Sequence, residues 1–497
     1  MKPLVFLVSA GLKPFADEKI FQGLSAREKA RIWADSVPDS AGTDFIDTAK
    51  TLPSVFLHMA DAAQSLHADC AVLAYADCPF LNNRLCAELL ELHRKYAAEY
   101  TFADGYPYGF TPEIIDVGLL RILAALAEAK SEFAQAVFNR DSVFSLLKTD
   151  INSFEIETLI APQDYRYLRL DFSCSSKRNT LACRRLFNLL PECDDADLLC
   201  KTAAETAEVQ RTLPSFYNVQ IYASGEKESI YEPAVKGDCV PVQADIDSFK
   251  KLTEKIAAFS GDAVVGLSFC GDPLYHADFA SFAEAVLEHK ELSLLIETDA
   301  QMLDEQTALR IQRAAGANEV RLSGYAAVNW IIKLDACDEQ LYKEIRTRGS
   351  LKKGEEAVQL LKKLFPGAVY PQMVRMNCSE HQLEGFFRHW KADGGGELII
   401  QKYDHISGLL EDMRPADLSP AVRTPCWHIK RDMCILADGR VPRCKAAVFD
   451  SGGFYGNVFT EGLEKIWDKG YAKLNEQLGG TYDGQCGKSD EYYTFNF

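Results

Sequence analysis

Cysteine is the residue type whose number first suggests chemistry in this sequence. The chain holds 15 cysteines among 497 residues. Its opening stretch, KPLVFLVSAGL, is short, lacks the small-residue cleavage site of a signal peptide, and is expected to form a buried first strand. We therefore expect reduced thiols, most of them packed in the interior and a few of them metal ligands. Thiolates bind zinc and iron–sulfur clusters.

Residues 420–497 are the segment in which a bound metal would matter most. They are rich in Gly, Cys and aromatic residues and show little helical periodicity apart from LEKIW (463–467). Small, loop-rich domains of this kind often depend on a metal or a cluster for their stability.

The overall composition excludes two classes of partner. A net charge of −18 repels phosphate backbones, so nucleic acid is not expected as a general partner. No apolar run approaches the ~20 residues that a membrane-spanning helix needs. We expect a cytoplasmic protein of two or three domains that does not enter a membrane.

The first 190 residues alternate strand-like and helix-like runs, which predicts an α/β domain with a parallel sheet. Residues 191–213 are polar and predict a helical connector ahead of Pro214. The predicted strands of residues 1–190 are 5–10, 70–77, 100–104 and 165–172, and the predicted helices are 82–98, 113–130 and 178–190.

Residues 214–415 repeat a strand followed by a helix about six times. This repetition predicts an open, partial β/α barrel with its chemistry at the C-terminal ends of the strands. The predicted strands are 217–223, 263–269, 292–297, 329–335, 369–376 and 397–403. The predicted helices are 246–259, 277–289, 304–314, 351–364 and 380–392.

Four motifs lie at successive strand ends of this predicted barrel, and in this order they resemble radical S-adenosylmethionine (SAM) enzymes. The resemblance implies that Gly271, Asp272 and Pro273 form the turn that binds the methionine end of SAM. A tight turn without a ligand explains the same three residues equally well. The motifs are FCGDP (269–273), ETDA (297–300), KLDA with YKEIR (333–336 and 342–346), and IIQKYDHISG (399–408).

The first motif of that family is missing from this chain. Radical-SAM enzymes carry Cys-x3-Cys-x2-Cys after the first barrel strand, and these thiolates hold the 4Fe–4S cluster that passes one electron to SAM. The loop here reads SGEKESIYEP and places Gly225, Ser229 and Glu232 at the three cysteine positions. None of these residues is a good iron ligand at such a site. Any SAM that binds is therefore not expected to be reductively cleaved.

The tail, residues 420–497, resembles the SPASM domain of the same superfamily, and the whole chain resembles its spiro-SPASM group. The residues that carry this resemblance are Cys426, Gly439 with Cys444 five positions later, and Cys486. The resemblance implies that the three cysteines hold an auxiliary 4Fe–4S cluster. Tetrahedral zinc and purely structural thiols are the alternatives.

A fourth ligand for this centre is less well defined. The family has a second cysteine three positions after the one at 486, and this chain has Ser489. Ser489, Asp490, water or an external ligand would complete the set. Cys434 is a further candidate, although the alternation of MCIL (433–436) also fits a buried strand.

The first 190 residues resemble GT-A, cytidylyltransferase-like domains. YADCPFL (75–81) carries the resemblance, which implies that Asp77 helps to bind a divalent metal such as Mg²⁺. An ordinary Asp-x-Pro turn is the alternative. The family's phosphate-binding turn is poorly matched by SAGLKPFADEKIF (9–21), which has lysines but no arginine.

These observations predict a GT-A/nucleotidyltransferase-like parallel sheet, a radical-SAM-like partial β/α barrel and a small SPASM-like cysteine domain. They support a degenerate radical-SAM/SPASM-like protein that binds one auxiliary 4Fe–4S cluster and modifies or handles a peptide or another partner. One alternative is a nucleotidyl- or glycosyltransferase that uses the first domain. The other is a non-enzymatic scaffold that binds zinc or no metal. The predicted segments are 1–190, 191–213, 214–415 and 420–497.

Overall fold

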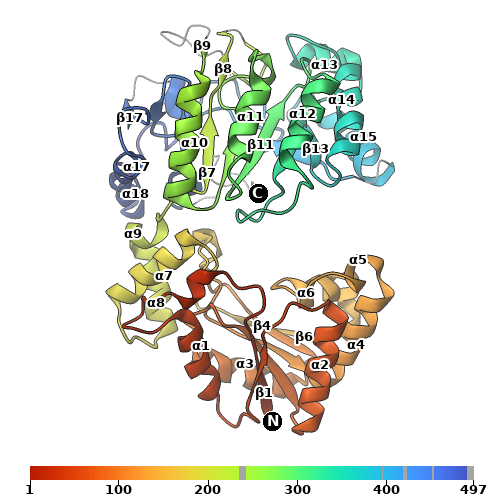
Figure 1. Ribbon diagram of the computed structural model, residues 1–497, viewed down its shortest axis with the longest axis vertical. Coiled ribbons are helices and arrows are strands. Elements are labelled where there is room, and N and C mark those ends of the chain that lie inside the picture. The colour runs from red at the N-terminus through yellow and green to blue at the C-terminus, as the bar shows by residue number, and fades with distance from the viewer. Residues whose placement is uncertain (226, 234–241, 394–395, 418–421, 450–452, 490–497) are drawn as a thin grey trace. The chain divides into compact units, whose positions relative to one another are not determined.

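The computed structural model describes residues 1–225, 227–233, 242–393, 396–417, 422–449 and 453–489 (Figure 1). The chain divides into two compact units, residues 1–212 and 213–497. The helices of the predicted connector, α8 (Ala196–Glu205) and α9 (Ala207–Gln210), belong to the first unit and pack against α7 (Lys177–Leu189). In the described part of the chain, none of the helices has the length and apolar character needed to span a bilayer.

The first unit is built on a six-stranded sheet in the order β2-β1-β3-β5-β4-β6. Neighbouring strands are parallel except where β5 pairs with β3 and with β4. β1 and β3 are buried along their whole length, as expected for strands covered on both faces. The strands are β1 (Pro3–Val8), β2 (Thr43–Ile46), β3 (Cys70–Tyr75), β4 (Tyr100–Asp104), β5 (Glu113–Asp116) and β6 (Ile156–Ile160).

Helices cover both faces of this sheet (Figure 1). On one face, Trp33 of α1 and Leu89 of α3 share a buried cluster with Val5 of β1. On the other face, Phe56 of α2 lies in a cluster with Phe6 of β1. The helices are α1 (Ala26–Asp35), α2 (Leu52–Ser65), α3 (Asn83–Tyr96), α4 (Val117–Ala129), α5 (Ser131–Ala134) and α6 (Ser142–Leu147).

Two sequence predictions for this unit are wrong. Residues 113–130 are not one helix, because β5 pairs with two strands before α4 begins at the cap residue Asp116. Residues 165–172 are not a strand, because they form a 3₁₀ turn in which Arg169 has a φ of 50°. The late strand is β6 instead. The sheet is therefore mixed, not wholly parallel.

The second unit is built on a seven-stranded, all-parallel sheet in the order β14-β13-β12-β11-β10-β7-β15. Six of the strands follow one another in chain order and helices connect them, so the predicted partial β/α barrel is confirmed. The strands are β7 (Phe216–Val219), β10 (Ala263–Gly266), β11 (Leu292–Thr298), β12 (Val328–Lys333), β13 (Val369–Arg375), β14 (Ile399–Lys402) and β15 (Asp432–Ile435).

The helices of the barrel start where side chains cap them. Asp245, Asp304, Asp338 and Ser350 each accept a hydrogen bond from a backbone N–H in the first helical turn that follows. The five longer helices are α10 (Ile246–Ser260), α11 (Phe279–Leu287), α12 (Glu305–Ala315), α13 (Glu339–Ile345) and α14 (Leu351–Leu364). Residues 380–392, predicted as one helix, form short pieces including α15 (Leu383–Phe387).

The tail is joined to the barrel through its sheet and its core. Strand β15 pairs with β7, so the first barrel strand has a tail strand as its outer neighbour. Val441, Ile466 and Trp467 of the tail lie in the same buried cluster as Tyr217 and Val265 of the barrel. The described tail elements are α16 (Trp427–Arg431), β15, β16 (Arg440–Pro442), β17 (Phe454–Asn457), α17 (Leu463–Asp468) and α18 (Gly470–Leu478).

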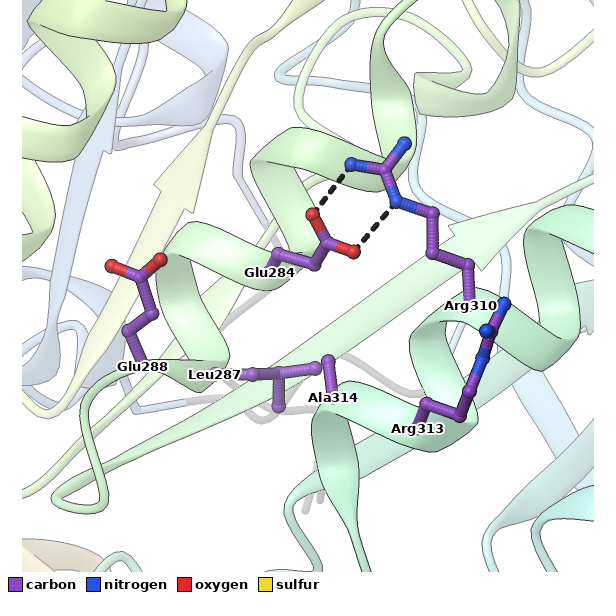
Figure 2. Close-up of a pocket in the computed structure, with 6 residues that line it drawn as sticks. All are labelled: Glu284, Leu287, Glu288, Arg310, Arg313 and Ala314. Atoms are coloured by element: carbon purple, nitrogen blue, oxygen red, sulfur yellow. Dashed lines mark hydrogen bonds and ion pairs between the residues drawn. The ribbon is translucent and has the colours of Figure 1, made fainter.

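A surface hollow lies on the outside of the barrel, between α11 and α12 (Figure 2). The Arg310 guanidinium donates to the Glu284 carboxylate there, with N–O distances of 2.5 and 2.6 Å. The two charges neutralise each other in this pair. The hollow lies on the helical side of the sheet, away from the strand ends at which barrel chemistry occurs.

Candidate functional site

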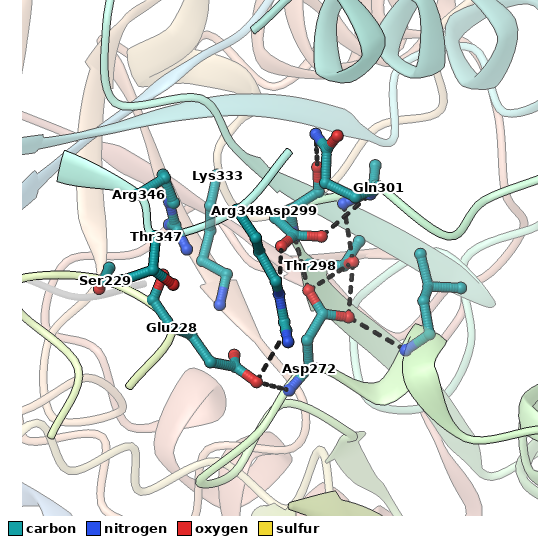
Figure 3. A network of polar contacts seen from close by, with 12 residues as sticks. Glu228, Ser229, Asp272, Thr298, Asp299, Gln301, Lys333, Arg346, Thr347 and Arg348 are labelled. Atoms are coloured by element: carbon teal, nitrogen blue, oxygen red, sulfur yellow. Dashed lines mark hydrogen bonds and ion pairs between the residues drawn. The ribbon is translucent and has the colours of Figure 1, made fainter. Parts of the chain in front are cut away.

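The C-terminal ends of β10, β11 and β12 face the short loop that follows β8 (Tyr222–Ala223), and charged side chains gather there (Figure 3). These side chains are buried or mostly buried, so each needs a partner within the protein. The acids are Glu228, Glu232, Asp272, Asp299 and Asp335, and the bases are Lys333, Arg346 and Arg348.

The predicted SAM-binding turn lies at the end of β10. Gly271 has a φ of 156°, and a Cβ at this position would lie 2.0 Å from the backbone oxygen of Tyr222. Only glycine fits so close to the neighbouring strand. Pro273 begins a 3₁₀ turn that the Asp272 side chain caps by accepting a hydrogen bond from Leu274 N at 3.0 Å.

The Asp272 carboxylate is fully buried and already bonded to three donors. Besides Leu274 N, it accepts from Thr298 Oγ1 at 2.8 and 2.9 Å and from Asp299 N at 2.7 Å. These contacts account for the turn without a ligand. They leave the carboxylate poorly placed to receive the ammonium group of SAM.

Negative charges crowd around Asp272. Burial, and next the charges of Asp299 and Glu228, raise the pKa of Asp272 to about 8, while Lys333 acts in the opposite direction. Arg348 lies beside this group: its Nη2 donates to Glu228 at 2.9 Å and its Nε lies 3.6 Å from Asp299. The Arg348 guanidinium is therefore paired with two of the three acids, Glu228 and Asp299.

Glu232, at the third of the missing cysteine positions, is engaged in ion pairs. Lys333 Nζ lies 2.8 Å from one of its oxygens and Arg346 Nη1 lies 3.3 Å from the other, to which Ser229 also donates at 2.9 Å. Burial alone would raise the pKa of Glu232, but the charges of Lys333 and Arg346 lower it to about 2. Glu232 is therefore a structural counter-ion for two buried cations.

Asp335 is the second counter-ion of Arg346. Its carboxylate is fully buried and accepts from Arg346 at 2.7 and 2.9 Å, from Tyr231 at 2.8 Å and from Val374 N at 3.0 Å. Its backbone has a φ of 61°, an uncommon conformation for a residue other than glycine. The loop carrying Tyr231 is thereby fixed to the end of β12.

The residues at the cysteine positions do not fit an iron–sulfur cluster. Gly225 has no side chain, the Ser229 hydroxyl donates to Glu232, and Glu232 faces two cations. The expected loss of this motif thus coincides with a replacement at one position, because Glu232 forms ion pairs where the third thiolate would lie.

The sequence motifs found only part of this network. Asp272, Asp299, Lys333, Asp335 and Arg346 all belong to the four barrel motifs. Figure 3 shows four of these side chains at one edge of the sheet, and Asp335 pairs with Arg346. The motifs do not contain the residues that complete the network. Those residues are Glu228, Tyr231 and Arg348.

In the tail, one buried glutamine contacts two of the three predicted ligand cysteines. Gln477 of α18 is 2% exposed. Its Oε1 accepts from Cys426 N at 2.8 Å, and its Nε2 lies 3.5 Å from Cys486 Sγ. Gln477 therefore brings together two segments that are far apart in the sequence.

The three tail thiols also affect one another's ionisation. Burial raises the pKa of Cys426 to about 12, and charges on Cys444 and Cys486 add to the rise. Burial likewise raises the pKa of Cys486 to about 11, again with a contribution from Cys444. Burial also raises the pKa of Cys444, although the backbone N–H groups of Ala447 and Ala446 act in the opposite direction.

The described residues do not form a closed metal site. Within this part of the chain, no group of three or more His, Cys, Asp or Glu side chains is placed so that it could hold a metal ion. Cys434 is buried in β15 with Phe269 and Leu436. Ser489 N donates to Gln485 O at 3.1 Å. Asp490 lies outside the described residues, and the identity of a fourth ligand stays a prediction.

In the first unit, Asp77 does not fit a divalent metal site. Its carboxylate is fully buried and forms an ion pair with the Arg140 guanidinium. A cation thus already neutralises it. The Mg²⁺ expectation has no support from this geometry.

Two relatives from Treponema pallidum (strain Nichols) resemble this chain in sequence. One uncharacterized protein is 38% identical over 374 residues, which are 73% of this chain and 100% of that protein. A second uncharacterized protein is 47% identical over 53 residues, or 11% of this chain and 24% of its own length. No family model matches the chain.

Solved structures resemble it at low identity. Streptococcus suis SuiB bound to precursor peptide SuiA has a TM-score of 0.44 at 12% identity, covering 71% of this chain and 83% of that one. BtrN in complex with AdoMet and 2-DOIA scores 0.37 at 14%, covering 56% and 94%. A cytidylyltransferase from Leptospira borgpetersenii scores 0.34 at 10%, covering 42% and 94%. With TM-scores below 0.5, these likenesses carry nothing about what the chain does.

Proposed function

We propose that this chain is a degenerate radical-SAM/SPASM-like protein. It belongs to the same family as the uncharacterized Treponema pallidum protein that it matches over 374 residues. It holds one auxiliary 4Fe–4S cluster through Cys426, Cys444 and Cys486. It takes part in the modification or handling of a peptide or another partner. It does not cleave SAM reductively.

The contact of Gln477 with two separate cysteine segments is the observation that carries the proposal. Its amide holds the backbone of Cys426 and approaches the sulfur of Cys486. Gln477 is buried, and a buried amide is expected to have a partner for each of its polar groups. Hydrogen bonds to ligand sulfurs are a usual outer-shell feature of metal centres.

The chemistry of the donor set agrees with this proposal. Burial keeps Cys426 and Cys486 protonated at neutral pH, and a bound cation would favour their thiolate forms. A bound cluster would supply electron transfer or contact with the partner. Cys426, Cys444 and Cys486 would hold it, while Gln477 positions two of them.

The absence of reductive SAM cleavage rests on the barrel loop. Cleavage needs an electron from a cluster that chelates SAM, and Glu232 with its two cations takes the place of one of its thiolates. In our proposal the barrel keeps a binding surface without the radical chemistry.

Anaerobic reconstitution followed by iron, sulfide and zinc analysis tests the cluster. We expect iron and sulfide in the wild-type protein, with a charge-transfer absorbance that Cys444→Ala removes. The matched control is Cys337→Ala, which changes an exposed cysteine in the barrel. Zinc without sulfide would favour the scaffold alternative, and no bound metal would end the cluster proposal.

A second assay tests the barrel separately. SAM incubated with the reduced, reconstituted protein should yield no 5′-deoxyadenosine above a protein-free blank. Protein-dependent formation of this product would contradict our interpretation of the 224–233 loop, whatever the metal analysis shows.

A further inference from the structure

The first unit contains a buried charge that the proposed function does not use. Asp77 follows β3 at its C-terminal end, the edge at which open α/β sheets bind ligands. Its side chain is 0% exposed. A carboxylate cannot stay ionised in such a place without a cation or several donors beside it.

The chain supplies that cation from a distant segment. Arg140 lies in the turn before α6, and its guanidinium donates to the Asp77 carboxylate. The same group lies over the rings of Tyr75 and Tyr108, at 4.7 and 4.8 Å from their centroids, and donates to the Tyr108 hydroxyl at 2.5 Å. Two aromatic faces and two acceptors therefore hold the guanidinium in one orientation.

A second carboxylate, that of Asp171, is sensitive to the charge of this cation. Asp171 accepts from Ser173 N at 2.8 Å and from Asn179 Nδ2 at 2.9 Å. Burial raises its pKa, and the charge of Asp77 adds to the rise while Arg140 opposes it. The ionisation of Asp171 therefore depends on the charges of both Arg140 and Asp77.

Carboxylate oxygens are also the ligands that Mg²⁺ and Mn²⁺ prefer. We propose that Arg140 is a built-in replacement for a divalent cation. Its guanidinium occupies the place beside Asp77 and closes this position to metal ions. The first unit then keeps a carboxylate suited to a divalent metal ion, while the chain itself supplies the positive charge.

Removing the guanidinium should open the site to a real metal ion. Mn²⁺ binding to the full chain can be followed by electron paramagnetic resonance, with Arg140→Met retaining length without charge. We expect at least a tenfold gain in Mn²⁺ affinity over wild type and the loss of that gain in Arg140→Met with Asp77→Asn. Arg121→Met, at an exposed arginine paired with Asp61, is the matched control and should match wild type.

Two results would overturn the proposal. One is an Mn²⁺ site in the wild-type chain that Asp77→Asn removes. The other is an Arg140→Met protein that unfolds cooperatively on heating, as wild type does, yet binds Mn²⁺ no more tightly than wild type. The comparison of wild type with Asp77→Asn decides the question even where Arg140→Met is unstable. Equal binding by those two proteins supports an internal cation.

Discussion

The barrel loop and the tail are two places where this chain departs from the cysteine patterns it resembles, and they depart in different ways. In the barrel loop all three cysteine positions are changed, and Glu232 forms ion pairs with Lys333 and Arg346. In the tail, three of four cysteines remain, and Gln477 contacts two of them. The charges of the barrel loop are paired within the protein, whereas the tail keeps three cysteines that we propose as cluster ligands.

The contrast shows two ways in which buried ionisable groups can be accommodated in a folded protein. A buried cluster of charges is tolerated when acids and bases pair within it, as Asp335 and Arg346 do. The buried tail thiols differ, because burial raises their pKa and a cation is needed before they become thiolates. We therefore expect the barrel loop to depend on its ion pairs and the tail to depend on bound metal.

The largest expected effect is the loss of bound metal from the tail. Cys486→Ser should reduce bound iron and sulfide after reconstitution to the background of a protein with no cluster, because three ligands are already one fewer than usual. Metal analysis with visible absorbance measures this. Cys378→Ser, a half-buried cysteine in the barrel, should retain the full metal content. Equal content in both variants would remove the distinction between the two regions.

The next largest expected effect is a loss of folding stability in the barrel. Asp335→Asn should lower the free energy of unfolding by about 3–5 kcal/mol, because it leaves the buried Arg346 without its main counter-ion. Urea denaturation followed by circular dichroism measures it. Asp438→Asn, at an exposed pair with Arg440, should cost under ~1 kcal/mol. A loss as small as this for Asp335 would mean that the network does not hold the loop.

Acid should weaken the barrel loop in a defined pH range. The pKa of Glu232 is about 2 in the folded protein and about 4.5 in an unfolded chain, so its contribution is complete above pH ~4.5 and is lost as the pH falls towards 2. The contribution is ~3 kcal/mol by linkage. Glu232→Gln should remove that part of the pH dependence of the free energy of unfolding, measured by denaturation. If the loss of stability between pH 4.5 and 2 is the same in the variant as in wild type, the ion pairs do not stabilise the loop.

The smallest expected effect is at Gln477. Gln477→Leu keeps the ligands and removes only the amide, so the metal should remain bound but leave faster. We expect about a tenfold faster loss to a chelator, which is the lower end of the usual effect of outer-shell partners. Gln340→Leu, on the exposed face of α13, is the matched control. A rate equal to wild type would mean that Gln477 serves folding alone.

The barrel could be predicted from the sequence because its strands are short apolar runs separated by amphipathic helices. The predicted strand at 292–297 is β11 almost to the residue. In the first unit, EIID (113–116) could not be recognised as a strand, because the apolar helix pattern of α4 begins directly after it. YRYLRLDF alternates like a strand, yet it forms a turn around the left-handed Arg169.

The charged network could be predicted only in part. Lys333 and Arg346 lie in recognisable motifs, so their place at the strand ends followed from the pattern. Their shared partner Glu232 lies about 100 residues earlier in the chain, and no local periodicity relates residues over that distance. The same holds for Asp77 and Arg140, whose pairing depends on how two separate loops meet.

The pairing of β15 with β7 has a consequence for the order of folding during synthesis. β7 is the first strand of its sheet to leave the ribosome, and its outer neighbour is one of the last. Until β15 arrives, one edge of β7 presents unpaired backbone groups to any strand nearby. A nascent chain that stalls before residue 432 should therefore need a chaperone, or it should aggregate through that edge.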